Sequence, residues 1–268
     1  MNVLVLGGDE RSRFLHIQFN KAGHRTHYYS DAELGLGDIK TGQIDMAVLP
    51  IPTKLGQGGS LLPFKHIDLT EILRVIPEDA RIIYGSWNEI VKTQMEQRLA
   101  TNLLDDEPFT MANAYLTAEA ALGILLANGT SMVKGSRCLI AGFGRIGAAL
   151  FKLLMDIEAK VTVATGHKGS AKIIRALGGE AIGYDAIPES LESFDFVLNT
   201  APSPIFALDD LRCYGGLYYE LASPPYGFEA ETLDDKDCNI IMCPALPGKC
   251  YPKDAADVIY RSIFGCNQ

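Results

Sequence analysis

The stretch Ile140-Ala141-Gly142-Phe143-Gly144-Arg145-Ile146-Gly147 decides the fold, because it places a G-x-G-x-x-G turn between an apolar run and a helical pattern. Each glycine has a separate role in such a turn. Gly142 makes the tight bend, Gly144 lets the backbone approach a pyrophosphate, and Gly147 lets helix and strand pack closely. Free N–H groups at the start of the helix favour the phosphate charge. The stretch therefore predicts a dinucleotide site, with a purely structural turn as the alternative.

The segments around this turn have the order of a βαβ unit. Residues 137–141 predict a buried strand, residues 146–155 a helix, and residues 160–164 a second strand. After that strand comes Thr165-Gly166-His167-Lys168, where a site for NAD normally has an acidic residue that binds the ribose 2′-OH. Thr165, His167 and Lys168 could instead hydrogen-bond and neutralise a 2′-phosphate. We expect NADP as the cofactor, with NAD as the alternative.

The composition describes a globular protein without a general affinity for polyanions. The 268 residues suffice for two domains, and a hydrophobic content of 47% supplies their cores. A net charge of −9 argues against a nucleic-acid or anionic-membrane binder. The longest largely apolar stretch, residues 118–127, is too short for a membrane span, and Met1 leads directly into a strand without a secretion signal. We therefore expect a cytoplasmic protein.

The cysteine pattern does not indicate a metal site. The six cysteines form no C-x-x-C pair, and Cys238, Cys243 and Cys250 have no histidine nearby that would complete a ligand set. We expect reduced, mostly buried thiols and no metal.

Strands alternate with helices on both sides of the glycine turn, which predicts two α/β halves with parallel sheets. We expect two Rossmann-like doubly wound parallel-sheet domains joined by a long helix at residues 111–128. Residues 1–110 would form the first domain, with the C-terminal segment 250–268 packing back onto it, and residues 111–249 the linking helix and the dinucleotide-binding domain. The other expected strands are 2–6, 25–28, 46–49, 81–84, 194–199, 216–221 and 239–242, and the other expected helices are 11–22, 69–73, 88–99 and 253–264.

Four short motifs, each present once, follow one another in a characteristic order along almost the whole chain. They are Gly7-Gly8-Asp9-Glu10-Arg11, Leu49-Pro50-Ile51-Pro52, Asn113-Ala114-Tyr115-Leu116-Thr117-Ala118-Glu119 and Leu246-Pro247-Gly248-Lys249. In this order and spacing the chain resembles the A-subunit family of bacterial spore dipicolinate synthase. The resemblance implies a nicotinamide-dependent dehydrogenase that works with a flavoprotein-like B subunit. Its product would be pyridine-2,6-dicarboxylate, made in the mother cell of a sporulating bacterium.

Two other functions stay open beside this one. The two-domain arrangement is also similar to the 2-hydroxyacid dehydrogenases, which leaves an oxidoreductase acting on another small acid. A non-catalytic nucleotide-binding subunit is the alternative from a different class. Homo-oligomerisation is left open by the sequence.

Three loops should lie beyond the carboxyl ends of the strands of the second domain, where open parallel sheets bind ligands. Asn199-Thr200-Ala201-Pro202-Ser203-Pro204 and Ala222-Ser223-Pro224-Pro225 follow two strands, and residues 244–249 follow the last. Thr200, Ala201, Pro202, Ala222 and Ser223 are therefore expected at a nicotinamide pocket. Ordinary turn chemistry is the alternative, since these residue types are common in loops.

A ring dicarboxylate needs cationic partners in a closed site. Lys249 is our first choice for one carboxylate, and Arg11, with the backbone after Gly7-Gly8, for the other from an opposite wall. For Arg11 and Arg13 the alternative is a solvated first helical turn, paired with Asp9 and Glu10. Asn113 and Thr117 could orient the ring or a water molecule.

No histidine stands in a sequence pattern that indicates a catalytic base. The 2-hydroxyacid dehydrogenases normally have a histidine after the last nucleotide-domain strand, where this chain has Pro247-Gly248-Lys249. His16 fits a packing or surface position at helical spacing. This pattern disfavours lactate-like carbonyl chemistry and fits an oxidation that ends in an aromatic ring, which requires less acid–base help.

Overall fold

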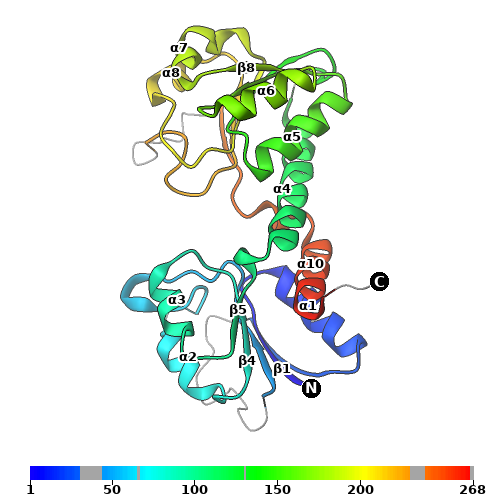
Figure 1. The fold of residues 1–268 in the computed structure, drawn as a ribbon, viewed down its shortest axis with the longest axis vertical. Coiled ribbons are helices and arrows are strands. Elements are labelled where there is room, and N and C mark those ends of the chain that lie inside the picture. The colour runs from blue at the N-terminus through cyan, green and yellow to red at the C-terminus, as the bar shows by residue number, and fades with distance from the viewer. Residues whose placement is uncertain (31–43, 65–66, 130, 230–238, 266–268) are drawn as a thin grey trace. The chain divides into compact units, whose positions relative to one another are not determined.

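The structure is a computed structural model, and it describes residues 1–30, 44–64, 67–129, 131–229 and 239–265. The chain divides into two compact units, one formed by Met1–Asn113 with Pro247–Gln268 and the other by Ala114–Leu246 (Figure 1). Each unit contains one parallel sheet covered by helices, and each is described by itself. The expected α/β class with two doubly wound parallel sheets is confirmed.

The first unit is built on a parallel sheet in the order β2-β1-β3-β4-β5. Its strands are β1 (Asn2–Leu6), β2 (Arg25–Tyr29), β3 (Met46–Val48), β4 (Arg81–Tyr84) and β5 (Ala100–Asn102), and its helices include α1 (Glu10–Lys21), α2 (Leu69–Val75), α3 (Glu89–Met95) and α10 (Pro252–Phe264). The strand order reverses between β1 and β3, because β2 lies on one side of β1 and all later strands on the other. That reversal is the point at which doubly wound sheets bind ligands.

Helices cover both faces of this sheet because successive strand residues point to opposite sides. Val3 and Val5 face a core that includes Leu15 of α1 and Ile259 of α10. The alternate residues of β1 face a second core, built with α2 and α3. Phe19 and Tyr260 also meet edge to face at 5.3 Å between ring centroids. The C-terminal helix is therefore part of the first unit, where it packs against α1 (Figure 1).

The second unit is built on a parallel sheet in the order β11-β10-β9-β6-β7-β8. Counted from β6, this is the 3-2-1-4-5-6 order of dinucleotide-binding domains, read from the other edge. Its strands are β6 (Arg137–Ala141), β7 (Lys160–Ala164), β8 (Glu180–Ile182), β9 (Phe196–Asn199), β10 (Leu217–Glu220) and β11 (Ile240–Met242), and its helices include α5 (Arg145–Asp156), α6 (Lys168–Ala176), α7 (Ile187–Ser190) and α8 (Leu208–Cys213). The order reverses between β6 and β9, beside the glycine turn.

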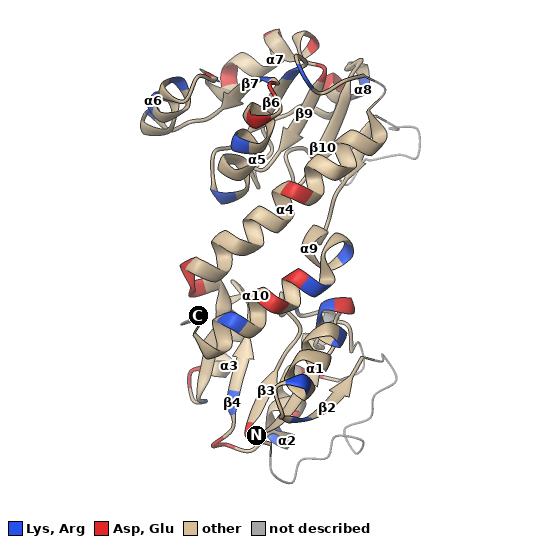
Figure 2. Cartoon of the chain, turned by 90° about the vertical axis from the view of Figure 1, so that its right-hand side faces the viewer, with Lys and Arg blue, Asp and Glu red and all other residues tan. Residues whose placement is uncertain are grey.

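The helix α4 (Glu107–Asn128) runs from the first unit into the second. It begins four residues before the expected 111–128, because Glu107 and Pro108 form its first turn. Its only charged residues are Glu107 and Glu119, so nearly the whole helix is drawn tan in Figure 2, the colour of residues without charge. Contrary to the expectation from residues 118–127, α4 is long and apolar enough to cross a membrane, although one such helix is weak evidence because core helices share this composition.

Two expected elements differ in kind. The helix expected at 88–99 ends at Met95, and β5 follows as a separate strand, paired with β4 through Ile82 and Ala100. The loop expected at 244–249 contains the short helix α9 (Leu246–Cys250). The sequence also did not indicate β8 or the helices α6, α7 and α8, which are short.

Candidate functional site

The glycine turn lies at the switch point of the second sheet, and each glycine has a different environment. Gly142 follows β6 with a φ of +95°, which L side chains rarely adopt, and a Cβ there would lie 2.8 Å from Thr200 Oγ1. A Cβ on Gly147 would overlap the carbonyl oxygen of Gly142. A Cβ on Gly144 would meet no atom within 4 Å. Only the middle glycine faces open space, as the approach of a pyrophosphate requires.

The start of α5 suits a phosphate group. Gly144 is its N-cap residue, and no side chain caps the helix by a hydrogen bond. Gly144 and Arg145 are exposed, while Phe143 and Ile146 are half-buried and Gly147 is buried. The first N–H groups of a helix lack intrahelical partners and attract negative charge. The residues present therefore fit a nicotinamide dinucleotide.

The loop after β9 is fixed to β6 across the switch point. Thr200 donates from its backbone N–H and from its hydroxyl to the carbonyl of Ala141, at 2.8 and 2.9 Å. Ala201 is buried, whereas Pro202 is exposed. After β10, Ala222 is half-buried and Ser223 exposed. These positions lie at the carboxyl edge of the sheet, where the sequence predicted them.

A buried carboxylate near these loops was missed by the sequence reasoning. Glu220 ends β10 with 1% of its surface exposed, and it accepts hydrogen bonds from Asn199 Nδ2 at 2.8 Å and from the Tyr218 hydroxyl at 2.8 Å. Burial raises the pKa of Glu220, and the hydrogen bonds that it accepts oppose that shift. The only available signal was an acidic residue at the end of an apolar strand.

The residues after β7 lie where a dinucleotide-binding domain contacts the adenosine ribose of its cofactor. Gly166, His167 and Lys168 are exposed, and the segment 165–168 contains no acidic residue. Thr165 differs from the expectation, because it is 8% exposed and its hydroxyl accepts the backbone N–H of His167 at 3.2 Å. His167 and Lys168 are therefore the accessible groups for a 2′-phosphate.

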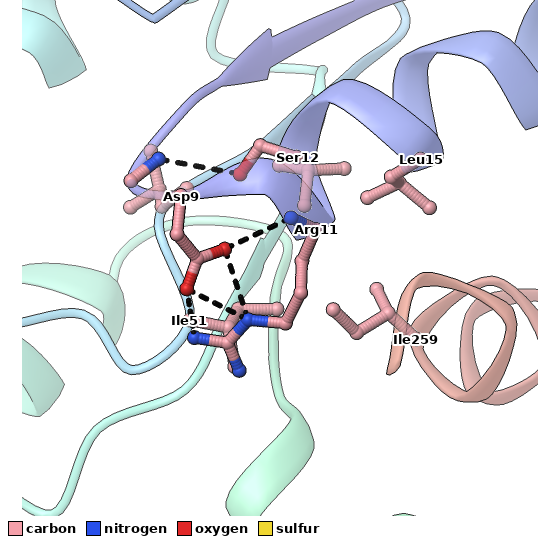
Figure 3. A pocket seen from close by; sticks show the side chains of 9 residues that line it. Asp9, Arg11, Ser12, Leu15, Ile51 and Ile259 are labelled. Carbon is pink, nitrogen blue, oxygen red and sulfur yellow. Dashed lines mark hydrogen bonds and ion pairs between the residues drawn. The ribbon is translucent and has the colours of Figure 1, made fainter. Parts of the chain in front are cut away.

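The first unit has a small pocket at its own switch point, lined by residues of α1, β3 and α10 and of the turns that follow β1 and β3. Figure 3 shows Arg11 folded back onto Asp9 in this pocket. Arg11 Nε donates to Asp9 Oδ1 at 3.0 Å and Nη2 donates to Oδ2 at 2.6 Å, while Nη1 points away from the carboxylate. Arg13 pairs with Glu10 at 2.7 Å. The alternative pairing of both arginines is thus what the structure shows, although Arg11 is buried rather than solvated.

The segment Leu246-Pro247-Gly248-Lys249 lies against this pair. A Cβ on Gly248 would meet Asp9 Oδ2 and lie 2.8 Å from Arg11 Nε. Pro247 and the residues after it belong to the first unit, with Arg11. Lys249 and Arg11 thus belong to one unit, whereas the sequence indicated different domains for them; their place on opposite walls of a substrate site stays a prediction. Lys249 is exposed on α9.

The remaining predicted substrate residues lie on α4, one helical turn apart. Asn113 is half-buried and Thr117 is 7% exposed. The division between the two units falls directly after Asn113. Their role toward a substrate stays a prediction.

No histidine in the described part of the chain forms an ion pair with a carboxylate. His16 Nδ1 lies 2.7 Å from the Thr26 hydroxyl, and its ring stacks on Tyr28 with centroids 5.3 Å apart. Burial lowers the pKa of His16. These contacts are those of a packing residue; His66 lies outside the described residues.

The described cysteines are equally divided between core and surface. Cys138 and Cys243 are buried, while Cys213 and Cys250 are exposed. The expectation of mostly buried thiols is therefore wrong for this set, and Cys238 and Cys266 lie outside the described residues. The described residues contain no group of three or more His, Cys, Asp or Glu arranged to hold a metal ion.

Sheet order and glycine turn together define a class: the chain has the Rossmann-type fold of nicotinamide-dependent dehydrogenases. No protein-family model matches it. It is 22% identical to the A subunit of dipicolinate synthase from Bacillus subtilis (strain 168), over 97% of this chain and 93% of that protein. The crystal structure of the dipicolinate synthase A subunit from Bacillus halodurans superposes with a TM-score of 0.81 at 20% identity, covering 98% of this chain and 96% of that one. The resemblance expected from the four motifs is confirmed.

A more distant likeness extends to the 2-hydroxyacid dehydrogenases. The NAD-complexed D-isomer specific enzyme from Lactobacillus delbrueckii ssp. bulgaricus has a TM-score of 0.60 at 10% identity, covering 98% of this chain and 95% of that one. At this identity the likeness is one of fold. That fold by itself does not distinguish NAD from NADP.

Proposed function

We propose that the chain is a nicotinamide-dependent dehydrogenase that forms pyridine-2,6-dicarboxylate from a dihydro or hydroxytetrahydro precursor. The observation that carries the proposal is the glycine turn at the switch point, with open space only at Gly144, in a chain that resembles the A subunit of dipicolinate synthase over 97% of its length. Because that relative is one subunit of a synthase, it supports action together with a B subunit. The resemblance to the A subunit of dipicolinate synthase supports a cytoplasmic location, by analogy the mother cell of a sporulating bacterium.

The cofactor would be held by the second unit. Gly144 and the N-terminus of α5 would bind the pyrophosphate, and the rest of the turn from Gly142 to Gly147 would surround it. The loops after β9 and β10 would bind the nicotinamide. A bound nicotinamide supplies a hydride acceptor. Exposed His167 and Lys168, in a segment 165–168 that contains no acidic residue, favour NADP over NAD.

The substrate would be held by cationic and amide groups. Lys249 is the exposed cation of α9, and Arg11 offers Nη1 while Asp9 fixes the rest of its guanidinium. From a dihydropyridine, the ring carbon loses a hydride and the ring a proton, which leaves the aromatic dicarboxylate. For the hydroxytetrahydro form, loss of water comes first. Since aromatisation drives the step, the absence of a carboxylate–histidine pair in the described residues does not prevent it.

Lys249→Ala tests the substrate assignment. Loss of a charge partner for a bound carboxylate costs ~2–5 kcal/mol when the pair is desolvated, so kcat/KM should fall by about thirtyfold or more. Lys253→Ala is the matched control, because Lys253 is also exposed and lies four residues later, in the first turn of α10. Cofactor affinity should be unchanged in both variants. Normal turnover by Lys249→Ala would reject the dicarboxylate assignment.

A non-catalytic nucleotide-binding subunit is the second candidate. It is favoured by the observation that no described histidine is paired with a carboxylate. It predicts cofactor binding without any turnover, whether or not a B subunit is present.

A further inference from the structure

Glu220 is a buried acidic residue for which the proposed chemistry has no use. It ends β10 at the carboxyl edge of the second sheet and is 1% exposed. Placing a carboxylate there is costly unless its oxygens are hydrogen-bonded. An acidic residue in such a position therefore requires an explanation from its partners.

Every group recorded on the Glu220 carboxylate is a donor. Oε1 accepts the backbone N–H of Ala222 at 2.8 Å, and Oε2 accepts that of Gly227 at 2.9 Å. Asn199 Nδ2 donates to both oxygens, at 2.8 and 3.0 Å, and the Tyr218 hydroxyl donates to Oε2 at 2.8 Å. An ionised carboxylate only accepts, so this set of donors matches it.

These bonds connect the two loops that follow β9 and β10. Asn199 also makes two hydrogen bonds with Ala201. Its Oδ1 accepts the backbone N–H of Ala201 at 3.1 Å, and its Nδ2 donates to the carbonyl of Ala201 at 3.0 Å. The carbonyl of Gly227 accepts the N–H groups of Ile205 and Phe206, each at 2.9 Å. The carboxylate thus fixes the loop after β10 through backbone N–H groups, and the loop after β9 through Asn199.

The packing around this contact leaves no space for a side chain at residue 227. A Cβ on Gly227 would lie 2.5 Å from both Asn199 Nδ2 and the Tyr218 hydroxyl. Tyr218 is itself fully buried. The backbone of residue 227 can therefore reach the Glu220 carboxylate only because this residue is glycine.

We infer that Glu220 is a positioning residue of the cofactor site: its carboxylate holds the loops after β9 and β10 in the arrangement that receives the nicotinamide end of the cofactor. The inference rests on the proposed function, which places the nicotinamide at these loops. Glu220 does not touch the cofactor. It acts through Asn199, Ala222 and Gly227.

Glu220→Gln is the direct test, measured as the dissociation constant of NADP by calorimetry on the intact chain. The amide keeps the size of the side chain but turns an NH2 group toward backbone donors, so NADP should bind about tenfold or more weakly. Tyr218→Phe is the matched control, because it removes one donor from the same Oε2 and leaves both loops tied. Its NADP affinity should stay within about twofold of the original.

A merely structural role would lower the unfolding temperature of both variants and leave the affinity of the folded protein unchanged; that outcome overturns the inference. If Glu220→Gln does not fold, Glu220→Asp takes its place as the test, because it keeps the negative charge. Its shorter side chain cannot reach both loop N–H groups, so it should also bind NADP less tightly, and unchanged affinity overturns the inference equally. If the unaltered chain binds neither NADP nor NAD, the proposed function fails and the inference with it; normal binding by the unaltered chain and by Glu220→Gln rejects the inference alone.

Discussion

Gly144→Val should separate cofactor binding from stability. Gly144 has an ordinary φ of −81°, and a Cβ there would meet nothing within 4 Å. Replacing glycine at an N-cap by an apolar residue costs about 1 kcal/mol or less, which corresponds to a fall in Tm of about 2–4 °C for a chain of this size. The valine side chain would, however, occupy the space that the pyrophosphate needs. NADP and NAD should each bind about tenfold or more weakly.

Gly147→Ala should act mainly on stability, whereas Gly144→Val should act mainly on cofactor affinity. Its Cβ would overlap the carbonyl oxygen of Gly142 and lie 3.0 Å from Thr200 Oγ1, so strand and helix would have to separate. Overpacking of this kind costs about 1–3 kcal/mol. Gly123→Ala is the matched control, because Gly123 is exposed on α4 and a Cβ there also meets nothing.

Calorimetric titration with both cofactors, together with thermal unfolding of the same samples, gives both quantities. Gly144→Val should keep its Tm to within those few degrees and lose affinity. Gly147→Ala should lose Tm, and Gly123→Ala should lose neither Tm nor affinity. Cofactor binding by Gly144→Val that equals that of the unaltered chain would refute the placement of the pyrophosphate. An unchanged Tm for Gly147→Ala would refute the packing argument.

Further predictions concern the single residues Lys168, Cys138 and Gly248. Lys168→Ala should lower the affinity for NADP and leave that for NAD unchanged, in calorimetry; an unaltered preference would reject Lys168 as a 2′-phosphate ligand. Burial raises the pKa of Cys138 to about 11, so at about pH 8.5 iodoacetamide should label the exposed Cys213 and spare Cys138 until the protein unfolds. Because this pKa is raised from 9.0, the protonated thiol contributes stability that is present below pH 9 and is lost as the pH rises toward 11; Cys138→Ala should reduce that loss by up to about 3 kcal/mol in urea unfolding. Gly248→Ala should lower Tm, since its Cβ would meet the carboxylate of Asp9, and an unchanged Tm would show that α9 does not pack on that pair.

Local pattern was sufficient for the elements that are buried and clearly bounded. The strands β1, β4, β6 and β7 have the bounds that the sequence predicts, because each is an apolar run beside a turn or a charged residue. The strand β5 was missed, because its three residues are joined to α3 by a short turn and two of them are only half-buried. Its strand character comes from pairing with β4, a long-range contact that no local pattern encodes.

In the candidate site, too, local sequence pattern predicted some features and missed those that depend on contacts distant in the sequence. The roles of Gly142 and Gly147 could be predicted, since they depend on a turn between adjacent elements. The position of Gly248 against Arg11 and Asp9 could not, because it joins residues more than two hundred positions apart along the chain. Glu220 was missed because its role depends on Asn199 and Gly227, which contact it only when the loops after β9 and β10 have folded against the end of the sheet.

The most direct test of the central claim is the absorbance of the reduced nicotinamide at about 340 nm, followed with freshly generated dihydrodipicolinate and NADP or NAD, with and without a B subunit. We predict an increase that requires the substrate, is larger with NADP, and is lost in Gly144→Val. Cofactor binding without any increase, with the B subunit present, would contradict the account and identify the chain as a nucleotide-binding protein without dehydrogenase activity.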